Sequence, residues 1–257
     1  MIVKMPFLYP PKNADRPLHI WLPDDYDRTD AHYPVMYFFD GHNLFLDEDA
    51  TYGKSWGMKQ FLEQWGKQMI IVGIECGHDG EERLSEYLPY TAIGHFARFE
   101  PTGEATMDWI IHQIKPVIDS RFRTIPFREC TAIGGSSMGG LMALYAAVRH
   151  NRWFSKAACV STAMGFCMEP LMADLTGCTI SPDTRIYLSW GSREARGAKA
   201  PHRGDRSSQT YHNNKAVTDV LKKHKATVKM ECQVGGGHCE ADWEKLVPGF
   251  MDFLWMQ

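Results

Sequence analysis

The sequence lacks both a cluster of basic residues and a long apolar run, and each absence excludes a class of function. Its 28 lysines and arginines are spread among 31 aspartates and glutamates, with a formal net charge of −3. This balance argues against a nucleic-acid-binding face or a polybasic membrane anchor. No stretch approaches the ~20 apolar residues of a membrane span, and the segment from Met1 to Phe7 lacks the apolar core of a secretion signal. We therefore expect a cytoplasmic protein with neither nucleic-acid nor membrane partners.

Cysteine pairs and metal-binding or nucleotide-binding motifs are also missing. The seven cysteines form no C-x-x-C pair, and their odd number argues against a disulfide framework. The sequence contains no H-E-x-x-H motif, P-loop or dinucleotide fingerprint, and its eleven histidines do not group at the spacing of metal ligands. We expect free thiols, most of them buried, and a site that requires neither a metal nor a cofactor.

What the chain does contain is an alternation of short apolar runs and longer segments with helical periodicity. This pattern is typical of βαβ units and predicts one α/β domain over residues 1–257, with a mostly parallel sheet covered by helices on both faces. Strands are expected at Leu18–Leu22, Val35–Phe39, Ile70–Ile74, Thr131–Ile133, Lys156–Val160, Arg185–Trp190 and Thr227–Gln233. Helices are expected at Met58–Trp65, Met107–Phe122, Met138–His150, Gln209–His224 and Ala241–Trp255. Pro116 should kink the second helix or mark a first turn, and residues 192–208 should form a mobile surface loop.

The most informative motif is Gly135-x-Ser137-x-Gly139, between the predicted strand Thr131–Ile133 and an Ala/Leu-rich helix. This context is typical of a nucleophile elbow, in which a serine occupies a strained strand-to-helix turn and projects its Oγ from the sheet. Glycine on either side removes Cβ atoms that would collide. The alternative is a glycine-rich turn around a buried serine.

A serine hydroxyl needs a base, and His238 is the best candidate among the later histidines. It follows three glycines after the last predicted strand and precedes a helix, which places it on a loop at the sheet edge. The alternative is a histidine that only forms hydrogen bonds within a glycine turn.

An acid that orients the base should follow the predicted strand that ends at Trp190. Glu194 is the nearest carboxylate, and Asp183 and Asp205 are alternatives. The alternative is that Glu194 is a surface residue paired with Arg193 or Arg196. For the oxyanion hole, the N–H of Met138 supplies one donor, and the N–H of His42 supplies the other, with Gly41 close enough to compete.

With these residues in place, the chain resembles the putative-esterase family of α/β hydrolases, which includes esterase D, feruloyl and acetyl-xylan esterases, ferric-enterobactin esterases and mycolyl transferases. The resemblance rests on residues 37–45, 83–89, 134–145, 191–194 and 236–243. It implies an α/β-hydrolase fold with Ser137 as nucleophile, His238 as base and Glu194 as orienting acid. It also implies that His42 and Met138 form the oxyanion hole.

Two further residues are candidates for substrate contact. The segment around Arg83 looks most like the branch with siderophore esterases, where Arg83 would meet an anionic or catecholate substrate. An internal pair between Arg83 and Glu86 is the alternative. Trp56 would form a wall of the acyl pocket, or else pack in the core.

These observations predict a serine esterase that forms an acyl-enzyme on a small ester, such as an acetylated or feruloylated sugar or a siderophore ester. One rival is an acyltransferase that uses the same triad and replaces water by another alcohol. A second rival is a hydrolase-fold binding protein without catalytic activity.

Overall fold

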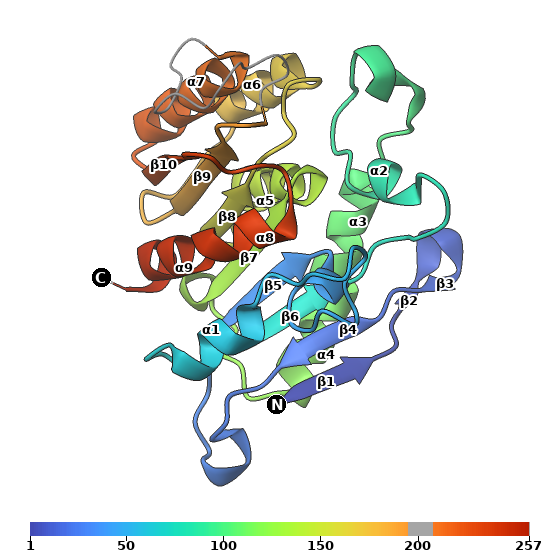
Figure 1. Cartoon of the computed structure of the whole chain (residues 1–257), viewed down its shortest axis with the longest axis vertical. Coiled ribbons are helices and arrows are strands. Elements are labelled where there is room, and N and C mark those ends of the chain that lie inside the picture. Colours follow the sequence, from blue (N-terminus) through green and yellow to red (C-terminus); the bar gives the residue numbers. More distant parts are fainter. Residues whose placement is uncertain (195–207, 257) are drawn as a thin grey trace.

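A mixed sheet of eight strands forms the centre of the computed structural model, which describes residues 1–194 and 208–256 (Figure 1). The strand order is β1-β4-β6-β5-β7-β8-β9-β10. Strand β4 pairs antiparallel with β1 and β6, and all other pairs in this sheet are parallel. The strands of this sheet are β1 (Ile2–Met5), β4 (Leu18–Trp21), β5 (Val35–Phe39), β6 (Ile70–Ile74), β7 (Thr131–Ser136), β8 (Lys156–Val160), β9 (Arg185–Gly191) and β10 (Thr227–Gln233). Strands β2 (Leu8–Tyr9) and β3 (Ala14–Asp15) form a separate antiparallel pair.

All seven predicted strands are confirmed, four of them with the predicted ends. The central strands β5 and β6 are buried along their whole length, as expected for continuous apolar runs covered on both faces. Strands β7 and β9 extend beyond the predicted ends to Ser136 and Gly191, where apolar residues give way to small ones. Strand β1 was not predicted, because its half-buried edge position requires little apolar surface.

Helices cover both faces of the sheet. One apolar cluster joins α1 and α9 to one face, and a larger cluster joins α3, α4, α5, α6 and α7 to the other. Figure 1 shows α1 and α9 on the same side of the strands. The helices are α1 (Met58–Gln64), α2 (Glu82–Glu86), α3 (Gly103–Trp109), α4 (Lys115–Arg121), α5 (Met138–Arg149), α6 (Met168–Gly177), α7 (Gln209–Lys223), α8 (Glu240–Trp243) and α9 (Val247–Trp255).

Two predicted helices are interrupted. The segment 107–122 comprises the end of α3, a π-helical turn at Ile110–Ile114, and α4, with Pro116 in the first turn of α4. Proline lacks an N–H and its ring crowds the carbonyl four residues earlier, so a regular α-helix is not maintained through this point. The predicted helix 241–255 is divided between α8 and α9 by a 3₁₀ turn at Glu244–Leu246. Helix α6 was not predicted.

Most of the predicted loop 192–208 lies outside the described residues. Among the helices that are described, none has the length and apolarity to cross a membrane.

The parallel strands place the segments that follow them at one edge of the sheet. The residues after β5, β7, β8, β9 and β10 all leave the carboxyl ends of neighbouring strands. In parallel α/β sheets ligands bind at this edge. The candidate site is therefore built from these loops.

Candidate active site

Ser137 occupies the strained turn between β7 and α5. Its backbone has φ 57° and ψ −119°, a conformation that a non-glycine residue rarely adopts. A Cβ on Gly135 would lie 2.6 Å from the carbonyl carbon of Gly139, so the turn has no space for a side chain there. The N–H of Ser137 donates to the carbonyl of Val160, 3.0 Å away, which ties the turn to β8. This geometry is that of a nucleophile elbow.

Glu194 and His238 are brought together at the ends of β9 and β10. Oε2 of Glu194 lies 3.2 Å from Nδ1 of His238. The other carboxylate oxygen, Oε1, accepts from the N–H of Gly191 at 2.7 Å and from the hydroxyl of Ser161 at 2.6 Å. Trp243 in turn donates its indole N–H to Ser161 Oγ at 2.9 Å. These donors fix one carboxylate oxygen and leave the second facing the imidazole.

The alternatives for the acid are placed differently. Asp183 precedes β9, at the opposite end of that strand, and forms an ion pair with Arg128 at 2.5 Å. Asp205 and Arg196 lie outside the described residues, and no ion pair joins Glu194 to Arg193 in the described part of the chain. Glu194 is thus the carboxylate that the structure brings to His238.

Ser137 and His238 line one pocket of about 540 Å³. The hydrogen bonds among the described residues do not include one between their side chains, and such contacts are often long before substrate binds. The lining of this pocket is polar for the most part and comprises Asp40, His42, Asn43, Thr51, Tyr52, Cys76, Gly77, His78, Gly80, Arg83, Ser136, Ser137, His238, Cys239, Glu240 and Trp243.

His42 and Met138 each lie in the first turn of a helical segment. His42 is in the 3₁₀ turn Gly41–Asn43 directly after β5, and Met138 is the first residue of α5. Backbone N–H groups at such positions have no partner within the helix and point outward. A Cβ on Gly41 would lie 2.2 Å from the carbonyl carbon of Gly73, so the turn packs directly against the β6 backbone.

Arg83 lines the pocket but is held by an aspartate. Its Nε and Nη2 donate to the two carboxylate oxygens of Asp40 at 2.6 and 2.7 Å. Burial raises the pKa of Asp40, but the charge and hydrogen bonds of Arg83 more than offset this and leave that pKa below its ordinary value. The alternative pair between Arg83 and Glu86 is not formed, because Glu86 accepts from Arg16 at 2.6 Å instead.

Trp56 lies in the core. It packs against Phe38 and Trp243, with ring centroids 5.7 and 5.6 Å away, and is 3% exposed. Trp243 lines the pocket and Trp56 is not among the lining residues. Trp56 therefore lies behind the wall of the pocket. Of the two positions considered for it, the structure shows packing in the core.

Sequence reasoning missed several residues around the pocket, namely Ser161, Cys76, His78 and Glu240. Ser161 directly follows β8, while Cys76 and His78 follow β6. Their positions after parallel strands were the signal that could have found them. Glu240 is buried at the start of α8, and burial raises the pKa of its carboxyl above the ordinary value.

Comparison with solved structures identifies the fold. The IroE-like serine hydrolase of Shewanella oneidensis superimposes with a TM-score of 0.74 at 20% identity, over 99% of this chain and 79% of that one. The enterobactin esterase FES of Shigella flexneri gives a TM-score of 0.73 at 19% identity, over 99% of this chain and 59% of that one. The fold is the predicted α/β-hydrolase fold.

Among curated proteins, the uncharacterized protein YbbA of Bacillus subtilis is 25% identical over 72% of this chain and 71% of its own length. Esterase Rv1288 of Mycobacterium tuberculosis is 31% identical over 55% of this chain, but the match spans only 28% of that protein. Of these two relatives, the second is named an esterase and the first is uncharacterized. Because the model of the family described as "Putative esterase" matches residues 12–253, the chain belongs to that family.

Proposed function

We propose that this protein is a serine carboxylic-ester hydrolase in which Ser137 is the nucleophile, His238 the base and Glu194 the orienting acid. The observation that carries the proposal is the 3.2 Å contact between Glu194 Oε2 and His238 Nδ1, beside a pocket that Ser137 also lines. An acid, a base and a strained serine from three strand ends are difficult to account for by packing alone.

In the proposed cycle, His238 takes the proton of Ser137 as Oγ attacks the ester carbonyl, and it then gives that proton to the departing alcohol. Water enters next. His238 removes a proton from the water, which attacks the acyl-enzyme, and it returns that proton to Ser137 Oγ as the bond from Oγ to the acyl group breaks and the carboxylic acid leaves. Glu194 accepts the Nδ1–H hydrogen bond throughout, which holds the tautomer and stabilises the imidazolium.

The N–H groups of Met138 and His42 are the proposed oxyanion donors. Met138 begins the 12-residue helix α5, whose partial positive charge at the N-terminus favours a developing negative charge, and His42 offers a backbone N–H from the turn after β5. The turn of His42 packs directly on β6, which restrains the backbone that carries this N–H.

The lining of the pocket favours a polar ester. Charged and hydrogen-bonding side chains such as Arg83, His78 and Glu240 surround the space next to Ser137. A long aliphatic acyl chain would remove water from these groups without replacing its hydrogen bonds, at a cost on the order of 1–3 kcal/mol for each polar atom left unsatisfied. We therefore propose a small polar substrate, of the kind represented by acylated sugars or siderophore esters.

The experiment is hydrolysis of p-nitrophenyl acetate and butyrate by wild type, Ser137→Ala and His238→Ala, each checked for folding by circular dichroism. We expect turnover by wild type, faster on the acetate, and loss in both variants on the order of 10³-fold or more. Full activity in Ser137→Ala would overturn the proposed mechanism.

A further inference from the structure

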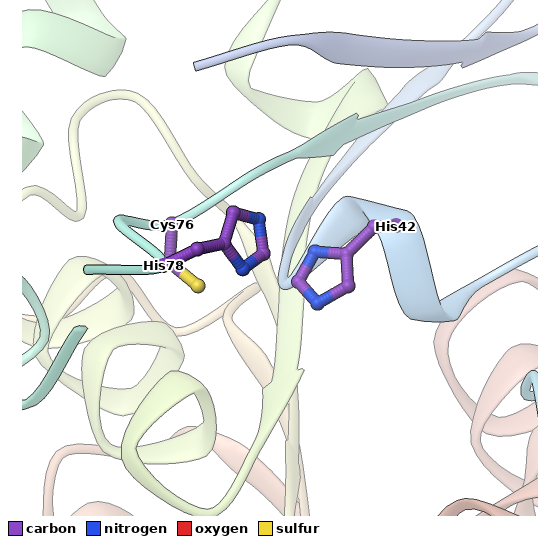
Figure 2. Close-up of side chains that lie close together, drawn as sticks. All are labelled: His42, Cys76 and His78. Carbon is purple, nitrogen blue, oxygen red and sulfur yellow. The ribbon is translucent and has the colours of Figure 1, made fainter. Parts of the chain in front are cut away.

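Three potential metal ligands meet at one side of the pocket. His42 comes from the turn after β5, and Cys76 and His78 come from the loop after β6. One ligand atom from each lies within 4.8 Å of those of the other two. Figure 2 shows the ring of His78 between the sulfur of Cys76 and the ring of His42. The rings of the two histidines are 4.7 Å apart, edge to face.

His42 offers a buried nitrogen without a partner. Its side chain is 6% exposed, its Nε2 lies 2.9 Å from Thr51 Oγ1, and its Nδ1 has no hydrogen-bond partner. A buried polar atom left without a partner is costly, and a bound ligand would remove that cost.

His78 is oriented by a carboxylate. Its Nε2 lies 2.9 Å from Oε2 of Glu75. The other carboxylate oxygen of Glu75, Oε1, lies 2.5 Å from Nε2 of His19, so Glu75 faces two imidazole rings and accepts from both. The Nε2–H of His78 therefore points to Glu75 and Nδ1 keeps its lone pair. A carboxylate behind a histidine in this way is common at metal sites, where it fixes the tautomer and orientation of the ligand.

Cys76 completes the set as a buried free thiol. We infer that His42, Cys76 and His78 bind one Zn²⁺ ion, with the fourth position of a tetrahedral ion left for water or a substrate oxygen. Two imidazoles and a thiolate are ligands that Zn²⁺ favours. On binding, the Zn–S bond forms, the S–H bond breaks and the proton leaves to solvent, with no change in oxidation state. Because cysteine binds a metal as the thiolate, the metal must displace that proton.

A Zn²⁺ ion at this site would lie in the pocket that Ser137 lines. All three ligands line it together with Ser137, and the N–H of His42 is a proposed oxyanion donor. An ion held there occupies substrate space, so Zn²⁺ should inhibit ester hydrolysis reversibly. This consequence rests on the proposed function, whereas metal binding itself does not.

The test is direct titration of chelator-treated, metal-free protein with Co²⁺, followed by displacement with Zn²⁺. We expect one equivalent of Co²⁺ to bind with a thiolate-to-cobalt charge-transfer band in the near ultraviolet, which Zn²⁺ abolishes. Isothermal titration with Zn²⁺ in two buffers of different ionisation enthalpy should show proton release.

Variants locate the ion. Cys76→Ser should abolish the charge-transfer band, and His78→Ala should weaken Zn²⁺ binding at least tenfold. Glu75→Gln should weaken it on the order of tenfold through the orientation of His78. Cys239→Ser removes another thiol from the same pocket, His112→Ala removes an exposed histidine remote from it, and both should bind as wild type does.

Absence of stoichiometric binding by the wild type, or a charge-transfer band that survives in Cys76→Ser, would overturn the site. The esterase assay separates the two proposals. Metal binding by a protein without esterase activity would support the site and contradict the proposed function. Esterase activity without metal binding would support the proposed function and overturn the metal site.

Discussion

Glu194 and His238 meet at 3.2 Å although 44 residues separate them in the chain. They meet because β9 and β10 are neighbouring parallel strands, so the loops that follow them leave the sheet side by side. The loops are also packed tightly, since a Cβ on Gly191 would lie 2.3 Å from the carbonyl oxygen of Gly236. The orientation of His238 is therefore set by backbone as well as by the carboxylate.

Replacement of Glu194 by glutamine should lower kcat on the order of 10²- to 10⁴-fold, because the amide favours the wrong tautomer of His238 and does not stabilise the imidazolium. Asp183→Asn is the matched control. Asp183 pairs with Arg128 away from the pocket, so kcat should stay within about twofold of wild type. Steady-state kinetics on p-nitrophenyl acetate measure both, and equal losses in the two variants would contradict the assignment.

Gly135→Ala should disrupt the elbow. The added Cβ would lie 2.6 Å from the backbone of Gly139, and this backbone cannot move without distorting α5. We expect a loss of about 2 kcal/mol in the free energy of unfolding, together with reduced activity. Gly66→Ala meets no atom within 4 Å, so it should change stability by less than about 0.5 kcal/mol. Urea denaturation of both proteins checks this contrast, and similar stabilities would argue against a strained turn.

The pair of Asp40 and Arg83 should make stability sensitive to acid. Because the pKa of Asp40 is lower in the folded chain than its ordinary value, its stabilising contribution is present above about pH 4 and is lost as the pH falls through the folded pKa. Asp40→Asn should flatten this part of the acid profile, and it should cost about 2 kcal/mol at neutral pH since half-buried Arg83 loses its charged hydrogen-bond partner.

The profile is measured by urea denaturation over a series of pH values. Asp30→Asn, at an exposed position, is the control and should leave the profile unchanged. If the free energy of unfolding falls with pH in the same way in wild type and Asp40→Asn, this pair does not set the acid sensitivity.

Trp56→Phe distinguishes a core residue from a pocket wall. Trp56 packs between Phe38 and Trp243, so the smaller ring should leave a cavity and lower stability by about 2 kcal/mol. KM for p-nitrophenyl butyrate should change little. In Trp243→Phe, which also loses the hydrogen bond to Ser161, kcat should fall. A large change of KM in Trp56→Phe with unchanged stability would place Trp56 in contact with the acyl group.

The sequence predicted the sheet well because buried parallel strands require unbroken apolar runs. Val35–Phe39 and Ile70–Ile74 are such runs, and both strands have the expected ends. Edge strand β1 was not predicted, because Ile2–Met5 buries little apolar surface. The π-helical turn before Pro116 was not predicted either, because the spacing of apolar residues continues through this turn even though the hydrogen-bond pattern changes.

For the site, order along the chain was enough to select Ser137, His238 and Glu194 as candidates, whose roles stay predictions. It was not enough for the cluster of His42, Cys76 and His78, whose members are separated by a strand and a helix. Their proximity follows from the register of β5 and β6, in which Phe39 lies beside Ile74 and the two following loops begin together. Nor did the sequence indicate that Asp40, rather than Glu86, would be the partner of Arg83.

Covalent labelling with a fluorophosphonate, read by intact mass and peptide mapping, tests directly whether Ser137 is the nucleophile. We expect one adduct per chain on Ser137 in the wild type, none in Ser137→Ala, and slower labelling in His238→Ala. A wild-type protein that remains unlabelled, or an adduct that persists in folded Ser137→Ala, would contradict the assignment of Ser137 as the nucleophile.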